Sequence, residues 1–357
     1  MNKQQLIVEL QSAGLKLANA EIGAAGRIGG AGPSDHKAVT VGDTTVMIPI
    51  FNSPAASSPY TVKEQKLQLN GEDISTVAFP SEPKFYSLTT SDGIPYKQIA
   101  LLHSKDVLAT TVLQTCIRYG DTATSCQFCA IGQSLAAGRT IARKTPSQLA
   151  EVAEAAVRLD GVKHMVMTTG TPSTSDRGAA YLTQCAKAIK AKVNIPIQAQ
   201  CEPPDDFIWF ERMKEAGIDS LGMHLEAVED KVRANIMPGK ATVSVDYYFQ
   251  AFTAAVKVFG WGQVSTYLLA GLGDSLKSLV EMSDRLIQIG VYPFIVPFVP
   301  ITGTPLAHHP TPRSEWMFAL YQEVGELLQR SGMSSTDIKA GCAKCGACSA
   351  LANFEGK

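Results

Sequence analysis

The sequence lacks an excess of charge of either sign, and it lacks long hydrophobic runs. Its 32 Lys and Arg residues balance 33 Asp and Glu residues, which leaves a formal net charge of -1. This balance gives no electrostatic reason to expect a nucleic acid or an anionic membrane as a partner. No apolar run approaches the roughly 20 residues that a membrane-spanning helix needs. The charged share of 18% and the hydrophobic share of 45% indicate a soluble globular protein.

The sequence also shows no secretory signal and no repeat at a fixed period. Polar residues interrupt the first apolar stretch, which instead predicts an amphipathic helix built on Leu6, Leu10, Leu15 and Leu17. We therefore expect a cytoplasmic protein. In that reducing compartment, clustered cysteines favour metal binding or catalysis over disulfides.

The leading part of the chain predicts a small, strand-rich extension. A glycine-rich stretch at 23–39 suits a loop, and apolar residues flank Gly42-Asp43 and Ser91-Asp92-Gly93 as they flank hairpin turns. The rest of the chain changes character near Asp106 and again after residue 332. We predict three parts: residues 1–105 as the extension, 106–332 as a βα domain, and 333–357 as a cysteine-rich tail.

Strand-like and helix-like runs alternate six times in the middle part, which indicates a parallel sheet with right-handed crossovers. The predicted fold is therefore α/β, a partial or complete (β/α) barrel of the TIM type, whose chemistry lies on the loops after the strands. The predicted strands are 107–113, 163–168, 195–199, 219–224, 263–270 and 292–299. The predicted helices are 146–159, 178–191, 205–216, 244–259, 275–289 and 313–331.

Three cysteines follow the first predicted barrel strand, within "TCIRYGDTATSCQFCAIGQ". The spacing Cys126-x-x-Cys129 lets one turn present two thiolates to one metal or cluster, and Cys116 adds a third. Three thiolates without a nearby fourth favour an iron–sulfur cube with one open iron. Zinc remains an alternative, although a structural zinc site usually has four ligands. A redox dithiol also remains, although it leaves Cys116 unexplained.

This loop, with the aromatic Phe128 before its last cysteine, resembles the signature of radical S-adenosylmethionine (SAM) enzymes. The usual family spacing is three residues and then two, whereas here it is nine and then two. The resemblance implies that Cys116, Cys126 and Cys129 bind a [4Fe-4S] cluster whose open iron chelates SAM. It implies reductive cleavage of SAM to a 5'-deoxyadenosyl radical that abstracts hydrogen from a substrate.

Further motifs follow the later strands in the family's order, and they are closest to the biotin synthase and lipoyl synthase branch. They are "MTTGT" at 167–171, "QCEPP" at 200–204, "MHLEA" at 223–227, "LLAGLGDS" at 268–275 and "VPITGTPLA" at 299–307. By resemblance, Arg233 pairs with the methionyl carboxylate, with a surface helix position as the alternative. The other implied cofactor-binding residues are Phe128, Thr168, Thr169, Gly170, Glu202, His224, Glu226 and Gly271.

The tail carries Cys342, Cys345 and Cys348 in a ferredoxin-like run, which favours an auxiliary [4Fe-4S] cluster over structural zinc. Water, substrate or Ser349 is the expected fourth ligand. The tail and the glycine-rich loop also resemble an uncharacterised radical SAM subfamily found in nitrilase-associated gene clusters.

The other cysteines and the histidines carry weaker expectations. We expect Cys185 in the core and Cys201 near the cavity. His36 is expected to cap a loop or to approach the site, and His308-His309 to lie in a solvated loop.

The function implied by the resemblance is a radical SAM enzyme with two clusters. The auxiliary cluster favours sulfur insertion at an unactivated carbon, as in lipoyl synthases. Radical tailoring of a small metabolite without sulfur transfer is one alternative, and a non-catalytic iron–sulfur or zinc scaffold is another. A reductant such as ferredoxin or flavodoxin is the implied partner, with a lipoyl carrier protein or a companion radical SAM protein as further candidates. The sequence does not identify the substrate.

Overall fold

The computed structural model describes residues 2–17, 36–50 and 53–356, so most of the predicted glycine-rich loop lies outside the described residues. Its largest sheet has seven strands in the order β13-β12-β11-β10-β9-β8-β7. Six of these strands are parallel, and β7 (Leu101–His103) pairs antiparallel with β8. The parallel strands are β8 (Val107–Thr111), β9 (His164–Thr168), β10 (Ile197–Gln200), β11 (Ser220–Gly222), β12 (Val264–Ala270) and β13 (Val291–Pro297).

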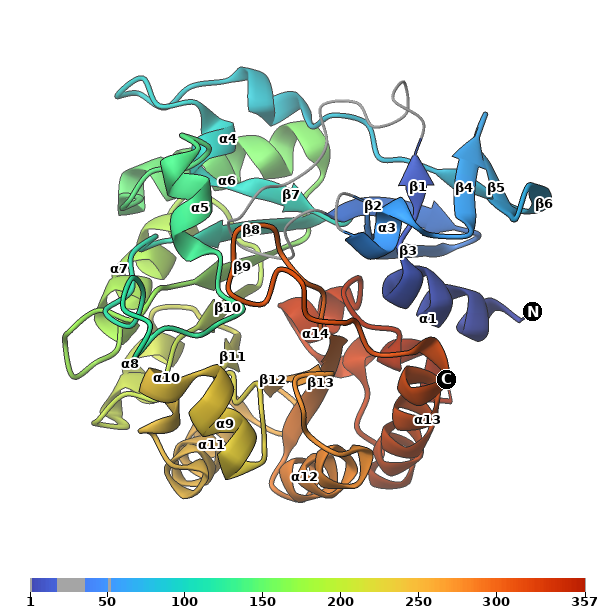
Figure 1. The fold of residues 1–357 in the computed structure, drawn as a ribbon. Helices are drawn as coiled ribbons and strands as arrows, with labels where there is room; N and C mark the ends of the chain where they lie inside the picture. The colour runs from blue at the N-terminus through green and yellow to red at the C-terminus, as the bar shows by residue number, and fades with distance from the viewer. Residues whose placement is uncertain (1, 18–35, 51–52, 357) are drawn as a thin grey trace.

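Helices cover the outer face of this curved sheet (Figure 1). The barrel is partial, because β13 and β7 stand at opposite ends of the strand order. The fold-class prediction is confirmed. All six predicted strands and all six predicted helices are present, each with ends within three residues of the prediction. The helices are α6 (Pro146–Asp160), α7 (Ala179–Lys190), α8 (Ile208–Glu215), α11 (Val245–Phe259), α12 (Leu276–Gln288) and α13 (Ser314–Ser331), with α5 (Ile131–Ala136), α9 (Asp230–Ile236) and α10 (Pro238–Ala241) in the loops.

Local chemistry explains why the helices begin and end where they do. Thr145 and Gln148 form a capping box at the start of α6, Pro146 occupies its first turn, and Gly161 ends it in the left-handed conformation. Apolar residues on α6, α7 and α12 pack on the sheet, where Leu149, Leu182 and their neighbours are fully buried. This packing fixes the strand ends, and therefore the loops that carry the site.

The extension holds a second sheet, in the order β1-β4-β5-β6-β2-β3. The predicted hairpin at Gly42-Asp43 is confirmed, since Val41 pairs with Thr44. The second predicted hairpin is present only in part: one antiparallel bridge, between Thr89 and Pro95, spans the turn, and helical turns flank it in place of strands. Prolines explain this, because Pro83 and Pro95 cannot donate to a ladder and instead begin those turns.

The elements of the extension are short. They are α1 (Lys3–Ala13), β1 (Lys16–Leu17), β2 (His36–Val41), β3 (Thr44–Pro49), α3 (Ser53–Ala56), β4 (Tyr60–Lys63), β5 (Lys66–Leu69), β6 (Glu72–Ala78), η1 (Lys84–Ser87) and α4 (Tyr96–Ile99). Helix α1 ends before Gly14, whose φ is 74°, so Leu15 and Leu17 lie beyond the helix, and the prediction that they belong to it is wrong.

The tail returns to the extension, and the two parts lie side by side (Figure 1). The Gln11 side chain donates to the carbonyl of Ala347 over 3.2 Å, and the Met47 N–H donates to the same carbonyl over 2.7 Å. The tail holds η2 (Ser335–Asp337), α14 (Cys342–Cys345) and η3 (Leu351–Phe354). Across the described residues, no helix has both the length and the apolar character to cross a membrane.

Candidate functional site

One cavity of about 390 Å³ runs through the inside of the barrel. Its lining includes both Val107 and Thr111, the first and last residues of β8, so it extends along the whole strand. All three cysteines of the loop after β8 line it, and so do all three cysteines of the tail. The loop cysteines lie at the carboxyl ends of the strands, whereas the tail enters near their amino ends.

The cysteine loop is held by backbone contacts with two other loops. The N–H of Gln127 donates to the carbonyl of Ile236, at the end of α9. Gly170 passes so close to the carbonyl oxygen of Thr115 that an added Cβ would lie 2.1 Å from it. The predicted residue Gly170 is therefore needed for this close approach, while Thr168, Thr169 and Phe128 line the cavity beside it.

The loop thiols are free and partly buried. Burial raises the pKa of Cys129 to about 11, and it raises the pKa of Cys126 further. Such thiols are protonated at neutral pH unless a metal binds them, which disfavours the redox dithiol alternative. No group of three His, Cys, Asp or Glu side chains within residues 2–17, 36–50 and 53–356 is placed to hold a single metal ion. Ligands of a cluster bind separate irons and stand farther apart.

Arg118 and Glu202 form a buried, bidentate ion pair at this end of the cavity. The Nε and Nη2 atoms of Arg118 lie 2.9 and 2.8 Å from the two carboxylate oxygens of Glu202, and Thr171 donates to Glu202 over 2.8 Å. Burial alone would raise the pKa of Glu202, but the hydrogen bond from Arg118 and the charge of Lys240 lower it below its ordinary value. Glu202 is therefore ionised.

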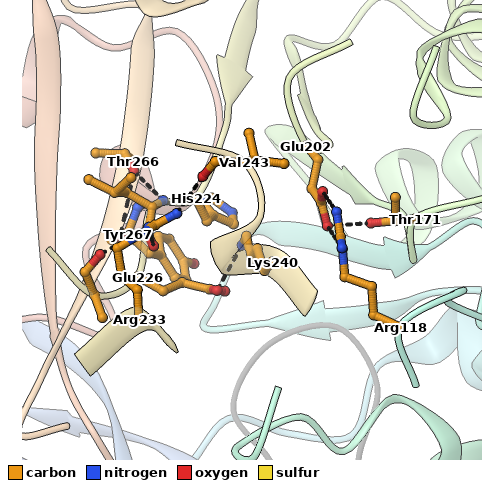
Figure 2. Close-up of polar contacts among 12 residues, drawn as sticks. Arg118, Thr171, Glu202, His224, Glu226, Arg233, Lys240, Val243, Thr266 and Tyr267 are labelled. Carbon is orange, nitrogen blue, oxygen red and sulfur yellow. Dashed lines mark hydrogen bonds and ion pairs between the residues drawn. The ribbon is translucent and has the colours of Figure 1, made fainter. Parts of the chain in front are cut away.

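Glu226 and Lys240 form a second buried pair, with Nζ 2.7 Å from Oε2. Figure 2 shows Lys240 between the carboxylates of Glu226 and Glu202. Burial alone would lower the pKa of Lys240, but the negative charges of Glu226 and Glu202 raise it above its ordinary value. Glu226 has a φ of 68°, a strained conformation for a residue with a side chain, and such strain is concentrated at functional sites.

His224 presents a buried N–H with no hydrogen-bond partner among the described atoms. Its Nδ1 accepts the backbone N–H of Tyr267 over 3.3 Å, and its ring stacks on the Tyr267 ring with centroids 4.1 Å apart. Burial lowers the pKa of His224 to about 3, so the ring is neutral. Because Nδ1 accepts, Nε2 carries the proton. His224 lines the cavity and supplies a donor that calls for an oxygen acceptor.

Arg233 and Gly271 do not line the cavity. The Arg233 side chain is 2% exposed and donates to the carbonyls of Leu225, Ala227 and Val243, over 2.8 to 3.1 Å (Figure 2). The surface alternative for Arg233 is therefore wrong, and the contacts that the structure shows are structural. Gly271 packs against Pro312, and its carbonyl lies 2.9 Å from Nε2 of His309.

Each tail cysteine has a polar neighbour from the barrel. Cys342 is hydrogen-bonded to Tyr267 and accepts from Nε2 of Gln200 over 3.3 Å. Cys345 is hydrogen-bonded to the side chain of Ser104, and Sγ of Cys348 lies 3.3 Å from Nε2 of His103. The three thiols thus sit in a polar end of the cavity that belongs to several strands.

The remaining candidates divide between core, outer surface and cavity. Ser349 does not line this cavity; it lines a second pocket, which Cys345 also lines, and it accepts the Leu351 N–H over 3.2 Å. Cys185 is fully buried in the core as predicted, and Cys201 lines the cavity as predicted. His36 lines the cavity from β2.

Sequence reasoning did not identify Arg118, Lys240, Tyr267 or His103. Arg118 stands two positions after Cys116, which is a usable signal. Lys240 and His103 have no local signal, because their partners are distant in the sequence.

Residues 122–286 match the model of the Radical SAM superfamily. This match spans a little under half of the chain and supports a radical SAM assignment. The match begins after Cys116, so the first cysteine of the loop lies outside it. The narrower resemblance to biotin and lipoyl synthases, and to the nitrilase-associated subfamily, remains a prediction.

Two known proteins are similar to this chain. It is 26% identical over 299 residues to bacteriochlorophyllide c C-7(1)-hydroxylase of Chlorobaculum limnaeum, covering 75% of this chain and 73% of that protein. Its fold is similar to that of methylornithine synthase, with a TM-score of 0.50 at 16% identity, covering 76% of this chain and 78% of that one.

The residues that line the cavity near the carboxyl ends of the strands fit the groups that radical SAM proteins bind. Three thiols from one loop suit a cluster with an open iron. The unpartnered Nε2–H of His224 suits a ribose hydroxyl, and the side-chain oxygens of Glu202 and Glu226 suit the amino and hydroxyl groups of SAM.

Proposed function

We propose that the protein is a two-cluster radical SAM enzyme that transforms a small substrate held inside its barrel. The observation that carries this proposal is the single cavity lined at one end by Cys116, Cys126 and Cys129 and at the other by the tail cysteines. A scaffold has no need of such a shared chamber, nor of buried polar groups directed at a nucleoside.

When bound, the reduced loop cluster supplies the electron that cleaves SAM to methionine and a 5'-deoxyadenosyl radical, which takes a hydrogen atom from the substrate. Glu202 binds the amino group of SAM, its charge held in place by Arg118. Glu226 and His224 bind the ribose hydroxyls, with Lys240 holding one oxygen of Glu226. Phe128, Thr168 and Thr169 close the chamber around the cofactor and exclude water.

We infer that the tail cysteines hold an auxiliary [4Fe-4S] cluster and that the favoured reaction is sulfur insertion. The chemistry available from such a cluster is donation of a sulfide to a substrate carbon radical, with one electron returned to its irons. The position of the tail thiols, across the cavity from the SAM residues, supports this reaction because a substrate between them faces both ends.

A second candidate is radical tailoring without sulfur transfer. The observation in its favour is the similarity to a hydroxylase of a bacteriochlorophyllide. In this case the tail cluster binds the substrate or accepts an electron from the product radical. The two reactions differ in the mass of the product, by added sulfur or added oxygen.

The test compares the intact protein with two triple variants after anaerobic reconstitution. We expect about eight irons per chain in the intact protein, and about four in each variant. The change of Cys116, Cys126 and Cys129 to Ala should abolish dithionite-dependent formation of 5'-deoxyadenosine. The change of Cys342, Cys345 and Cys348 to Ala should keep that cleavage and abolish the product.

The outcome that rules out sulfur insertion is a normal rate of product formation by the tail variant. Intact clusters without any cleavage of SAM would instead favour the scaffold.

The natural reductant is expected to be a ferredoxin or flavodoxin. A lipoyl carrier protein and a companion radical SAM protein are the partners to test first, by intact mass of the carrier after one turnover.

A further inference from the structure

The tail supplies three thiolates, and a cube has four irons, so the identity of any fourth protein ligand decides what the tail cluster does. We infer that His103 is this ligand and that the tail cluster is a Cys₃His site. The inference rests on the proposed function, because it requires that the tail cysteines hold a cluster.

Proximity is the first argument. Nε2 of His103 lies 3.3 Å from Sγ of Cys348. His103 is 6% exposed, and it lines the same cavity as all three tail cysteines. An imidazole in this position needs only a small shift to meet an iron held by the neighbouring thiolates.

The β7–β8 hairpin supplies a second argument. His103 pairs with Val107 across a three-residue turn, in which Ser104 has the left-handed φ of 57°. This conformation is uncommon for a residue with a side chain. The hairpin places two consecutive side chains against two cysteines, since Ser104 reaches Cys345 and His103 reaches Cys348.

The other polar groups near the thiols are poor ligands. Gln200 offers Cys342 its amide nitrogen, a donor without a lone pair for iron. Tyr267 contacts the same thiol through its hydroxyl, which is already engaged in that hydrogen bond. Ser349 does not line the cavity that all three tail cysteines share, and it lines a second pocket with Cys345 alone among them.

Charge supplies the last argument. The cationic side chains that line the described cavity are Arg118 and Lys240, and each is paired with a glutamate near the carboxyl ends of the strands. A fourth thiolate at the tail would add a further negative charge to the cavity. A neutral imidazole completes the cluster without that charge, which is costly to bury.

The experiment uses the full chain with Cys116, Cys126 and Cys129 changed to Ala, so that only the tail cluster is present. After reconstitution and reduction, pulsed electron paramagnetic resonance measures the hyperfine coupling of nitrogen to the cluster. We expect the strong coupling of a directly bound imidazole nitrogen, with the isotope change that ¹⁵N-histidine labelling produces. His103→Cys should abolish this signal while keeping about four irons.

A reduction potential supplies an independent readout. Because His103→Cys replaces a neutral ligand by an anionic one, the midpoint potential of the tail cluster should shift downward, in the direction known for thiolate against imidazole ligation. His36→Asn is the matched control, since His36 lines the same cavity from β2. This control should keep both the nitrogen coupling and the potential.

The outcomes separate the two proposals. A chain that assembles no iron at the tail cysteines contradicts the proposed second cluster. A chain with about four irons but only weak nitrogen coupling, as from a hydrogen-bonded imidazole, overturns His103 as a ligand. Strong nitrogen coupling that survives in His103→Cys, or that disappears in His36→Asn, overturns the assignment of His103 as a ligand as well.

Discussion

At the scale of single residues, the site depends on charges that are buried and paired. Lys240 lies between Glu226 and Glu202, and its side chain is 9% exposed. Removing one member of a buried pair leaves the other charge uncompensated, which costs more than the pair itself contributes. Single substitutions in this group therefore change folding and cofactor binding together, and paired substitutions separate the two.

Lys240→Met should lower the free energy of unfolding by about 3 kcal/mol, because it leaves Glu226 buried without its cation. Adding Glu226→Gln should recover most of this loss, while binding of SAM stays weak in both variants. Urea unfolding and equilibrium binding of SAM measure the two effects. If the double variant recovers none of the stability that Lys240→Met loses, the two side chains do not interact.

Arg233→Lys should reduce stability by about 2 to 4 kcal/mol and leave the Kd for SAM nearly unchanged in the folded protein. The guanidinium donates to three carbonyls that a lysine cannot satisfy together. Denaturation is measured beside SAM binding. A large loss of SAM affinity at unchanged stability would restore the role that resemblance assigned to Arg233, as partner of the methionyl carboxylate.

At the scale of elements, the tail is anchored at both of its ends. Before the cysteines, the N–H of Gly341 donates to Nδ1 of His164, the first residue of β9. After them, the buried carboxylate of Glu355 accepts from Tyr292, from Ser334 over 2.9 Å and from the N–H of Ser335 over 3.0 Å. These anchors hold the short helix α14 at the amino ends of the strands.

Glu355→Gln should loosen the tail, because a side chain whose two oxygens accept several hydrogen bonds is replaced by a group with one acceptor oxygen. We expect a loss of about 2 kcal/mol in stability and a partial loss of the tail irons, detected by iron analysis and limited proteolysis. Glu323→Gln, on the exposed face of α13, is the control. Equal behaviour of the two variants would contradict the anchoring role.

Acid should weaken the first anchor. Burial lowers the pKa of His164 to about 4 from an ordinary value of 6.5. Between these pH values the unfolded chain binds a proton that the folded chain does not, so the stability is complete above pH 6.5 and falls as the pH drops toward 4. The loss amounts to about 3 kcal/mol. Urea unfolding of the intact protein and of His164→Gln, from pH 7 to 4.5, should show a weaker pH dependence in the variant.

At the scale of the whole molecule, one chamber joins the SAM end of the barrel to the tail end. The extension and the tail together close the amino end, through contacts of Gln11 and Met47 with Ala347. The proposed function therefore places the substrate in the middle of the barrel, between two sites of different chemistry. A change in the middle should separate cleavage of SAM from conversion of the substrate.

Val166→Trp tests this separation. Val166 is 5% exposed on β9 and lines the chamber. The larger ring should exclude substrate, so that product formation falls at least about tenfold, at a cost in stability of about 1 to 3 kcal/mol. Slow cleavage of SAM should continue, measured as 5'-deoxyadenosine. Val166→Ile is the control, and loss of SAM cleavage in the Trp variant alone would place the cofactor deeper than proposed.

The order of the barrel elements follows from the sequence by itself. Hydrophobic periodicity, the capping box at Thr145 and the turn at Gly42-Asp43 are local features, and local features predict local structure. The spacing of the two sets of cysteines is likewise a property of short segments. The second hairpin keeps only one antiparallel bridge, because prolines on both sides begin helical turns in place of strands.

Only the tertiary structure decided which distant residues meet. Cys348 and His103 are 245 positions apart, and Arg118 and Glu202 are 84 apart, so no spacing in the sequence relates them. Their meeting depends on the curvature of the sheet and on the path by which the tail returns to the amino ends of the strands. Both are consequences of packing over the whole chain, which is why the shared chamber was not visible until the fold was known.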